Sequence, residues 1–300
     1  MIPIDVISGF LGAGKTTLAG LILKYYIERG EKPVYIVNEF GEAALDADII
    51  RHDGFEAVEM VGGCVCCTLK DNAVITIKRI VATFSPTRIV FEPSGVFMPD
   101  AFFDILKDDY LSARCRRGSI ITVVDSLSLA KARIKAGSFV SSQIRHADRL
   151  ILSKLEKSGA DVAELICDLK NLNPKADLFA KRWDLLGRED FERLTEPEND
   201  SRGHEGGHHH FHHTFEALTV NTEKSFDGDS LDRLCALLRG GTLGEICRVK
   251  GVIRREGKPA LLNIAFEDVN IGPSELEDFA LTFIGNGMDK DQIVKALNSL

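Results

Sequence analysis

Residues 7–18 read ISGFLGAGKTTL, and this stretch decides the expected fold. Residues 9–16 match the phosphate-binding signature G-x-x-x-x-G-K-[ST]. The apolar run Ile4–Ile7 precedes the signature as a strand would, and Thr16–Arg29 follows it with a helical pattern. In this context the glycines let backbone N–H groups turn toward phosphate oxygens, and the helix N-terminus adds a partial positive charge. The alternative, a glycine-rich turn without a ligand, leaves both the motif and its context unexplained.

Each reactive position of this loop has an expected task toward a nucleoside triphosphate. Lys15 is expected to reach the β- and γ-phosphates, and the Thr16 hydroxyl is expected to ligate Mg²⁺. The positions expected to hold the nucleotide in this loop are Gly9, Gly12, Ala13, Gly14, Lys15, Thr16 and Thr17.

A second element, Glu92-Pro93-Ser94-Gly95, follows the apolar strand candidate at residues 88–91. A carboxylate at a strand end can hold a Mg²⁺-bound water, and a glycine three residues later can offer its N–H to the γ-phosphate. We therefore expect Lys15, Glu92 and Gly95 to form the catalytic set, with Glu92 holding Mg²⁺ through water. The alternative is an ordinary surface glutamate before a turn. We prefer the catalytic interpretation because a chain with a phosphate loop needs such a group.

The base-reading segment is expected after the strand candidate Leu150–Leu152, where the chain reads Ser153-Lys154-Leu155-Glu156. The usual guanine reader is Asn-Lys-x-Asp, whose carboxylate accepts hydrogen bonds from the N1–H and 2-amino groups of guanine. Lys154 is in place to cover the base, and Glu156 can accept the same donors one methylene further out. Ser153 cannot replace the side-chain amide of asparagine. The place of this segment after the strand therefore favours guanine as the base, while its residue types weaken that prediction. The alternative is a strand end that happens to carry two common surface residues.

Short apolar runs alternate with helical patterns from residue 4 to about residue 180. Most runs are continuous rather than alternating, which is typical of strands covered on both faces. The expected strands are Ile4–Ile7, Val34–Val37, Val58–Val61, Ile89–Phe91, Ile120–Val124, Leu150–Leu152 and Leu178–Ala180. Helices are expected at Thr16–Arg29, Asn72–Ala82, Leu127–Ala136 and Ala160–Asn171, while residues 95–111 read less regularly. The alternation predicts an α/β fold with a mostly parallel, doubly wound sheet.

The pattern breaks at residues 187–213, a polar stretch with Gly, Pro and acidic residues that we interpret as a flexible linker. Residues 1–186 are therefore expected to form a P-loop NTPase domain, and residues 214–300 a small α+β domain. In the second domain the expected elements are strands at Thr214–Val220 and Phe279–Ile284, a hairpin of Cys247–Ile253 with Ala260–Phe266, and helices at Ser230–Leu238 and Asp289–Leu300.

Composition excludes several classes of protein. The net charge of -8 and the pI of about 5.6 give no global basic surface, so neither nucleic acid nor a membrane is expected as a partner. No apolar run approaches the roughly 20 residues that span a bilayer. The start MIPIDVISGF lacks a basic segment followed by a long apolar stretch, so we expect no signal peptide and a cytoplasmic location. Thiols are reduced there, which argues against a disulfide framework for the seven cysteines.

Three of the cysteines, Cys64, Cys66 and Cys67, fall within GGCVCC at residues 62–67. Thiolates are soft ligands that suit Zn²⁺ and other late transition metals. Glu39 and Glu42, which follow the second expected strand, are candidates for an additional ligand from outside the cysteine loop. The alternatives are buried cysteines that act as small apolar residues, and a vicinal redox pair.

Six of the eight histidines lie in the expected linker, and they are His204, His208, His209, His210, His212 and His213. Neutral imidazoles on a flexible segment bind Zn²⁺, Ni²⁺, Co²⁺ or Cu²⁺ with modest selectivity. We interpret the tract as a weak, delivery-type metal site. The alternative is a solvated linker with no role in metal binding.

Taken together, four motifs resemble the CobW-type GTPases, which are grouped with the HypB and UreG metallochaperones. They are residues 8–18, Asn38-Glu39-Phe40-Gly41-Glu42, Gly62-Gly63-Cys64-Val65-Cys66-Cys67 and Glu92-Pro93-Ser94-Gly95. The histidine tract ahead of a small C-terminal domain is similar too, as is Arg248-Val249-Lys250-Gly251. The resemblance covers essentially the whole chain. The chain departs from the family at Ser153 and Glu156, where the family has Asn and Asp.

The resemblance implies a Mg²⁺-dependent GTPase that binds GTP and GDP and carries a transition metal at its C-x-C-C loop. That metal is expected to be Zn²⁺, with Co²⁺ and Ni²⁺ as alternatives. Hydrolysis is expected to be coupled to handing the metal to a client metalloprotein or a cobalamin-related pathway, and a homodimer that depends on nucleotide or metal is a further expectation. Two other functions stay open: a nucleotide-responsive metal storage or sensing protein without turnover, and a P-loop kinase that uses ATP.

Overall fold

The structure is a computed structural model, and it describes residues 1–38, 56–59, 67–157, 162–196, 215–266 and 268–300. These residues fall into two compact units, one before and one after residues 197–214 in the sequence.

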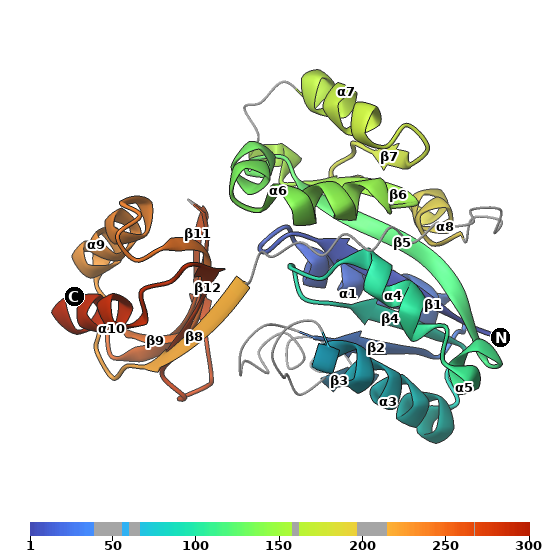
Figure 1. The fold of residues 1–300 in the computed structure, drawn as a ribbon, viewed down its shortest axis with the longest axis horizontal. Helices are drawn as coiled ribbons and strands as arrows, with labels where there is room; N and C mark the ends of the chain where they lie inside the picture. Colours follow the sequence, from blue (N-terminus) through green and yellow to red (C-terminus); the bar gives the residue numbers. More distant parts are fainter. Residues whose placement is uncertain (39–55, 60–66, 158–161, 197–214, 267) are drawn as a thin grey trace. The chain divides into compact units, whose positions relative to one another are not determined.

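In the described part of the first unit, seven strands form one parallel sheet in the order β3-β2-β4-β1-β5-β6-β7 (Figure 1). The strands are β1 (Ile2–Gly9), β2 (Pro33–Val37), β3 (Glu56–Glu59), β4 (Arg88–Glu92), β5 (Cys115–Asp125), β6 (Arg149–Ser153) and β7 (Asp177–Phe179). Every pairing between them is parallel. The continuous apolar runs of the sequence are explained because the central strands are covered on both faces. Strand β1 lies centrally, so the phosphate loop opens at the middle of the carboxyl edge of the sheet, where ligands bind in such folds.

Helices cover both faces of this sheet, which confirms the doubly wound arrangement. The helices are α1 (Lys15–Glu28), α3 (Cys67–Phe84), α4 (Pro99–Ile105), α5 (Asp109–Ser112), α6 (Leu129–Arg145), α7 (Val162–Leu172) and α8 (Arg188–Thr195), with short 3₁₀ helices at Leu155–Lys157 and Trp183–Leu185. The side chains of α1 and α8 share one core with alternate residues of the strands. Those of α3, α4 and α5 share the core on the opposite face. Residues 95–111, which read irregularly in sequence, hold the two short helices α4 and α5.

The predicted linker at 187–213 is wrong at its beginning, because residues 188–195 form helix α8 of the first unit. Leu194 is fully buried in the core, and the Phe191 ring stacks on Tyr25 of α1 with the ring centroids 5.5 Å apart. Arg149 also fixes the end of the helix, since its Nε donates to the carbonyl of Arg193 at 2.7 Å and its Nη2 to that of Glu196 at 3.2 Å. A cation at a helix C-terminus satisfies carbonyls that have no partner inside the helix. Residues 197–213 of the predicted linker lie outside the described residues.

Buried carboxylates join the strands of the first unit in their amino-terminal halves. Asp5 of β1 accepts hydrogen bonds from the Tyr26 hydroxyl at 2.6 Å, from Arg88 Nη1 at 3.0 Å and from the Ser119 amide at 2.8 Å. Burial raises the pKa of Asp5 above its usual value, an effect that the Arg88 guanidinium opposes. Buried polar groups of this kind need all their partners, because an unpaired one costs several kcal/mol.

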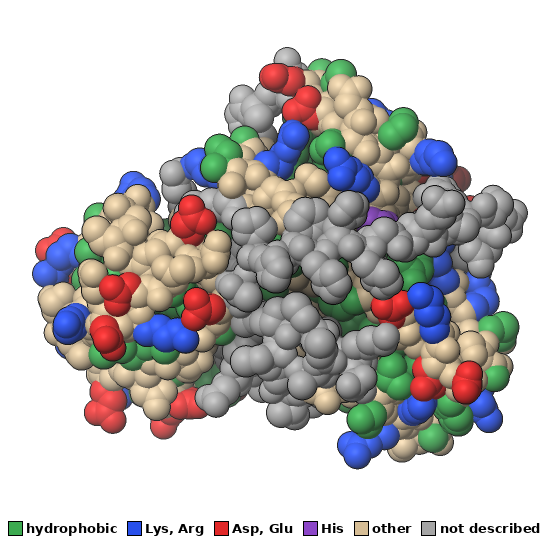
Figure 2. Space-filling view, in the orientation of Figure 1, with side chains coloured by type: hydrophobic (Ala, Val, Ile, Leu, Met, Phe, Trp, Pro, Cys, Tyr) green, Lys and Arg blue, Asp and Glu red, His purple; other side chains and the backbone are tan. Residues whose placement is uncertain are grey.

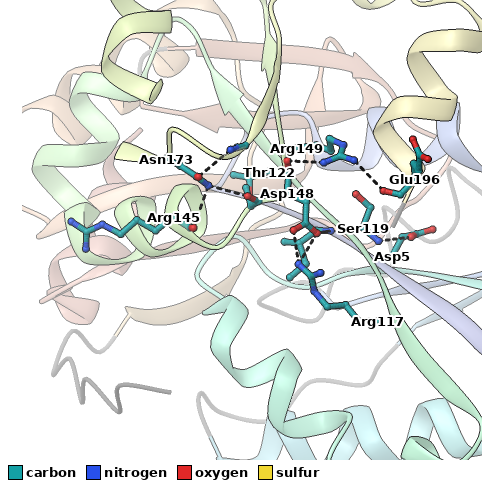
Figure 3. Close-up of polar contacts among 12 residues, drawn as sticks. Asp5, Arg117, Ser119, Thr122, Arg145, Asp148, Arg149, Asn173 and Glu196 are labelled. Atoms are coloured by element: carbon teal, nitrogen blue, oxygen red, sulfur yellow. Dashed lines mark hydrogen bonds and ion pairs between the residues drawn. The ribbon is translucent and has the colours of Figure 1, made fainter. Parts of the chain in front are cut away.

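Asp148 plays the same part between β5 and β6. Figure 3 shows the Arg117 guanidinium pointing at the Asp148 carboxylate, and Nη2 of Arg117 lies 2.5 and 2.7 Å from its two oxygens. The Ile120 amide donates to the same carboxylate at 2.9 Å. Asn173 lies nearby, and its Nδ2 donates to three carbonyls at the end of α6, including that of Ile144 at 2.8 Å. The amino-terminal halves of the strands are therefore cross-linked by charged side chains.

In the described part of the second unit, five strands form an antiparallel sheet in the order β11-β10-β9-β12-β8. They are β8 (Phe215–Asn221), β9 (Glu245–Arg255), β10 (Lys258–Ala265), β11 (Asp268–Pro273) and β12 (Ala280–Asn286), and the helices are α9 (Gly228–Arg239) and α10 (Lys290–Ser299). Leu234 of α9, Phe283 of β12 and Ile293 of α10 meet in one core. This unit confirms the predicted α+β fold and adds β11, which the sequence analysis did not predict.

On the face shown in Figure 2, acidic and basic side chains of the described residues are intermixed over the surface. Among the helices that the structure describes, none has both the length and the apolar character that a bilayer crossing requires.

Candidate functional site

The phosphate loop connects β1 to α1 and depends on glycines. Gly9 has a φ of 142°, and a Cβ there would lie 2.5 Å from the carbonyl oxygen of Val123 on the neighbouring strand. Gly14, the N-cap of α1, has a φ of 102°. Only glycine adopts such angles without strain, so the sequence motif is matched by the backbone conformation that exposes N–H groups to a phosphate.

The other predicted residues of the loop lie at the start of α1. Lys15 is 6% exposed, and its Nζ donates to the carbonyl of Phe10 across the loop at 3.5 Å. Gly12 has a positive φ of 75°, Ala13 is buried, and Thr17 is exposed in the first turn of the helix. The loop therefore curls around the lysine that is expected to meet the phosphates.

The structure brings Thr16 and Glu92, two of the predicted site residues, into contact. The Thr16 hydroxyl donates to Glu92 Oε1 at 3.0 Å, and the Tyr35 hydroxyl donates to Glu92 Oε2 at 2.5 Å. Glu92 is 5% exposed at the end of β4, so two hydroxyl groups orient a buried carboxylate. A hydroxyl and a carboxylate oxygen at this separation match the hard oxygen ligands that Mg²⁺ prefers. Tyr35 was missed in the sequence, where its hydroxyl is hidden in the apolar run of β2.

Gly95 lies against the phosphate loop. A Cβ on Gly95 would stand 2.6 Å from the Leu11 amide nitrogen and 2.9 Å from Leu11 Cα. The turn that contains Gly95 is also tied to helix α6, because Gln143 Nε2 donates to the carbonyls of Gly95 at 3.0 Å and Phe97 at 3.2 Å. Gln143 is 1% exposed and was also missed, because the helix expected at Leu127–Ala136 ends before it, whereas α6 continues to Arg145. The structure thus places the predicted catalytic glycine in direct contact with the phosphate loop.

The predicted base-reading residues follow β6. Ser153 is buried, and its hydroxyl has one long hydrogen bond, of 3.5 Å, to the carbonyl of Val124. Lys154 has a φ of 58° and pairs with Asp125, since Nζ lies 3.0 Å from Oδ2. Glu156 is exposed in the 3₁₀ helix Leu155–Lys157. The carboxylate that is expected to read the base is therefore accessible, and the serine directs its hydroxyl into the sheet.

Trp183, which the sequence analysis did not single out, lies between this segment and the phosphate loop. Its Nε1 donates to the carbonyl of Leu152 at 2.8 Å. Its ring carbon Cη2 is 3.2 Å from the position of a Cβ on Gly14. The signal that points to it is its place directly after β7, at the same edge of the sheet as the other loops.

The predicted transition-metal ligands lie outside the described residues or have undescribed side chains. Cys67 begins α3, but its side chain is outside the described part. The others are Glu39, Glu42, Cys64, Cys66, His204, His208, His209, His210, His212 and His213. Within the part of the chain that the structure describes, no group of three or more His, Cys, Asp or Glu side chains could hold a metal ion.

Sequence comparison gives relatives for both units. Residues 3–180 match the sequence model of the CobW/HypB/UreG nucleotide-binding domain, and residues 215–300 match that of the cobalamin synthesis protein CobW C-terminal domain. The zinc chaperone CobW of Sinorhizobium sp. is 25% identical over 348 aligned positions, which cover 100% of this chain and 97% of that protein. The zinc-regulated GTPase metalloprotein activator 1 of Schizosaccharomyces pombe is 29% identical over 173 positions, which cover 55% of this chain and 42% of that protein.

Among solved structures, the Zn(II)-bound YjiA GTPase of E. coli aligns with 100% of this chain and 98% of its own, with a TM-score of 0.45 and 19% identity. The first of the two sequence models covers more than half of the chain and includes the phosphate loop, Glu92 and the base-reading segment. The chain therefore belongs to the CobW/HypB/UreG family, as a CobW-type P-loop GTPase with a CobW C-terminal domain.

Proposed function

We propose that this protein binds GTP with Mg²⁺, hydrolyses it, and couples hydrolysis to the delivery of a transition metal to a client metalloprotein. The observation that carries the nucleotide part is the contact of Thr16 with Glu92 directly behind the phosphate loop. The metal part is supported by the relatives that are zinc chaperones and zinc-regulated activators, and by the C-x-C-C loop. The metal is Zn²⁺ in this proposal, with Co²⁺ and Ni²⁺ as alternatives.

The residues of the chain have distinct tasks in hydrolysis. Thr16 and Glu92 would hold Mg²⁺, which would supply positive charge to the phosphate groups of the nucleotide. Thr16 holds the ion through its hydroxyl oxygen, and Glu92 keeps that hydroxyl oriented because it accepts its proton. Lys15 draws the β- and γ-phosphates into the loop, and the Gly95 amide donates to the γ-phosphate. Water then forms a bond to the γ-phosphorus while the bond between that phosphorus and the β–γ bridging oxygen breaks. GDP leaves with the electron pair on that oxygen, and the proton of the water goes to the released inorganic phosphate.

Guanine is the base in this proposal, read by Glu156 and covered by the stem of Lys154. The salt bridge of Lys154 with Asp125 fixes the lysine at the end of β6. Ser153 lacks the amide of the usual motif, so a competition between GTP and ATP measures how far selectivity depends on Glu156.

Metal delivery is proposed for Cys64, Cys66 and Cys67 with Glu39 or Glu42, and for the histidine tract as a weaker site. The support is topological: β2 ends at Val37 just before the glutamates, and α3 begins at Cys67, the last of the three thiols. Strands β1, β2 and β4 run parallel, so their carboxyl ends share the edge where the phosphate loop lies. A nucleotide-dependent change at that edge can therefore reach both segments. A homodimer that forms with nucleotide or metal stays an untested prediction.

The test measures metal content, metal affinity and hydrolysis on the whole chain. Cys66→Ala and Cys67→Ala are expected to lose bound Zn²⁺ and metal-responsive hydrolysis while they keep nucleotide affinity, and Thr16→Ala to lose Mg²⁺-dependent hydrolysis while it keeps Zn²⁺. Competition with a chromophoric chelator is expected to give different Zn²⁺ affinities with GDP and with a non-hydrolysable GTP analogue. Equal affinities in the two states contradict coupling, because a nucleotide without differential affinity shifts no equilibrium. Different affinities without turnover favour a storage or sensing protein.

A further inference from the structure

The chain has one tryptophan, and the structure places it between two parts of the proposed nucleotide site. Trp183 begins the 3₁₀ helix Trp183–Leu185, which follows β7. The indole N–H is held by the carbonyl of Leu152, the residue before Ser153. The six-membered ring meets the other part, since Cη2 and Cζ3 lie 3.2 and 3.6 Å from the position of a Cβ on Gly14. The ring therefore spans from the end of β6 to the N-cap of α1.

This position has a chemical consequence at a GTPase site that lacks the usual asparagine. Ser153 Cβ lies 3.9 Å from the position of a Cβ on Gly14, but its hydroxyl donates to the carbonyl of Val124, so Ser153 offers the phosphate loop no amide. Trp183, in the 3₁₀ helix that follows β7, packs closer to the same glycine and presents an aromatic ring there in place of an amide. The indole is half-buried, so part of the ring stays open to a ligand, while the rest packs on the core that α1 and β7 share.

We propose that Trp183 forms one wall of the nucleoside pocket and contacts the purine ring system of the bound nucleotide. This inference rests on the proposed nucleotide binding, and it assigns different roles in that binding to Trp183 and Glu156. Stacking on an aromatic ring tolerates every base, because every base has a π face. Trp183 therefore contributes affinity for GTP and ATP alike, and Glu156 supplies the discrimination between them.

Because the chain has one tryptophan, its fluorescence reports on this site alone. Titration of the full chain with GDP, GTP or ATP is expected to change the intensity of Trp183 emission, and titration with inorganic phosphate is not. Equilibrium dialysis of the same nucleotides measures binding independently of the ring. Trp183→Ala is expected to lower the affinities for GTP and for ATP by the same factor, about tenfold. Trp183→Phe keeps an aromatic ring and is expected to stay within about threefold of the wild type.

Leu185→Ala is the matched control, because Leu185 is 58% exposed in the same 3₁₀ helix and is expected to leave affinity unchanged. If nucleotides bind in dialysis while emission stays constant and Trp183→Ala binds as tightly as the wild type, the inference is overturned and the proposed function stands. If the wild type binds no nucleotide, the proposed function itself falls. Should Trp183→Ala fail to fold, the emission of the wild type during nucleotide titration still decides, because constant emission with bound nucleotide overturns the inference.

Discussion

Gly95→Ala tests the contact between the catalytic turn and the phosphate loop. The added Cβ would lie 2.6, 2.8 and 2.9 Å from Leu11 N, Cδ2 and Cα, all closer than real Cβ atoms come. Two of these three atoms belong to the backbone, so a rotamer change cannot relieve the overlap. The turn and the loop must separate, and overpacking of this kind costs about 1–3 kcal/mol in the free energy of unfolding.

The chain offers a matched control for the same chemical change. Gly20 lies inside α1, and a Cβ there meets no atom within 4 Å. Gly20→Ala is therefore expected to raise the free energy of unfolding by about 0.5–1 kcal/mol, because alanine favours the helix. The two substitutions add one methyl group each and are expected to act with opposite signs.

The functional consequence is specific to the triphosphate. When the turn moves away, the Gly95 amide no longer reaches the γ-phosphate, while contacts to the other phosphates remain. Gly95→Ala is expected to lose most of its preference for a non-hydrolysable GTP analogue over GDP, measured by displacement of a fluorescent nucleotide. Urea unfolding measures the stability of both variants. The reasoning is refuted if Gly95→Ala keeps wild-type stability and wild-type preference, or if Gly20→Ala loses as much as Gly95→Ala.

Three further predictions concern other contacts. Tyr35→Phe removes the 2.5 Å hydrogen bond to Glu92, so we expect a loss of about 1.5–3 kcal/mol in urea unfolding and a higher Mg²⁺ requirement for hydrolysis; an unchanged Mg²⁺ titration would contradict a role for Tyr35. Arg117→Leu leaves the buried Asp148 without its cation and is expected to lower the free energy of unfolding by about 3–5 kcal/mol, whereas a loss below 1 kcal/mol would argue against the pairing. Hydrogen bonds from Ser230 lower the pKa of Asp227, the N-cap of α9. The ionised Asp227 carboxylate therefore stabilises the folded state fully above the ordinary aspartate pKa of about 3.9, and this stabilisation is lost as the pH falls through the lowered pKa. Thermal unfolding between about pH 3 and 6 is expected to show this loss in the wild type, and Asp227→Asn, which keeps an acceptor that does not titrate, is expected to show a smaller loss.

The positions of most strands in the chain could be predicted, because the physics that forms them is displayed locally in the sequence. Buried parallel strands such as β2 read as continuous apolar runs, and the phosphate loop marks the turn after β1. Strand β11 was not predicted because it lies at the edge of its sheet, and its partly exposed residues form no continuous apolar run. Helix α8 was not predicted because most of its residues are polar. Phe191 and Leu194 are the residues of α8 that pack against the core of the first unit.

The candidate site divides in the same way. Thr16 and Glu92 were predicted because each belongs to a motif whose chemistry is fixed by spacing. Tyr35, Gln143 and Trp183 lie in no motif, and their partners are 57, 48 and 31 residues away in the chain. Such contacts depend on the order of the strands in the sheet, which a single sequence does not state. The packing of Gly14 against Trp183 could be found only when that order was known.

The buried carboxylates Asp5 and Asp148 have a consequence for hydrogen–deuterium exchange. The amides of Ser119 and Ile120 are neighbours in β5, yet one donates to Asp5 toward β1 and the other to Asp148 toward β6. Exchange of either proton requires a charged, desolvated network to open, so both amides are expected to exchange only through the largest opening of the first unit. The amide of Gly95, at the opposite edge, is expected to exchange through small local openings and to slow when a triphosphate binds. Amide exchange is thus expected to be slow in the amino-terminal halves of the strands and fast at the carboxyl edge of the sheet, and only exchange at the carboxyl edge is expected to respond to nucleotide.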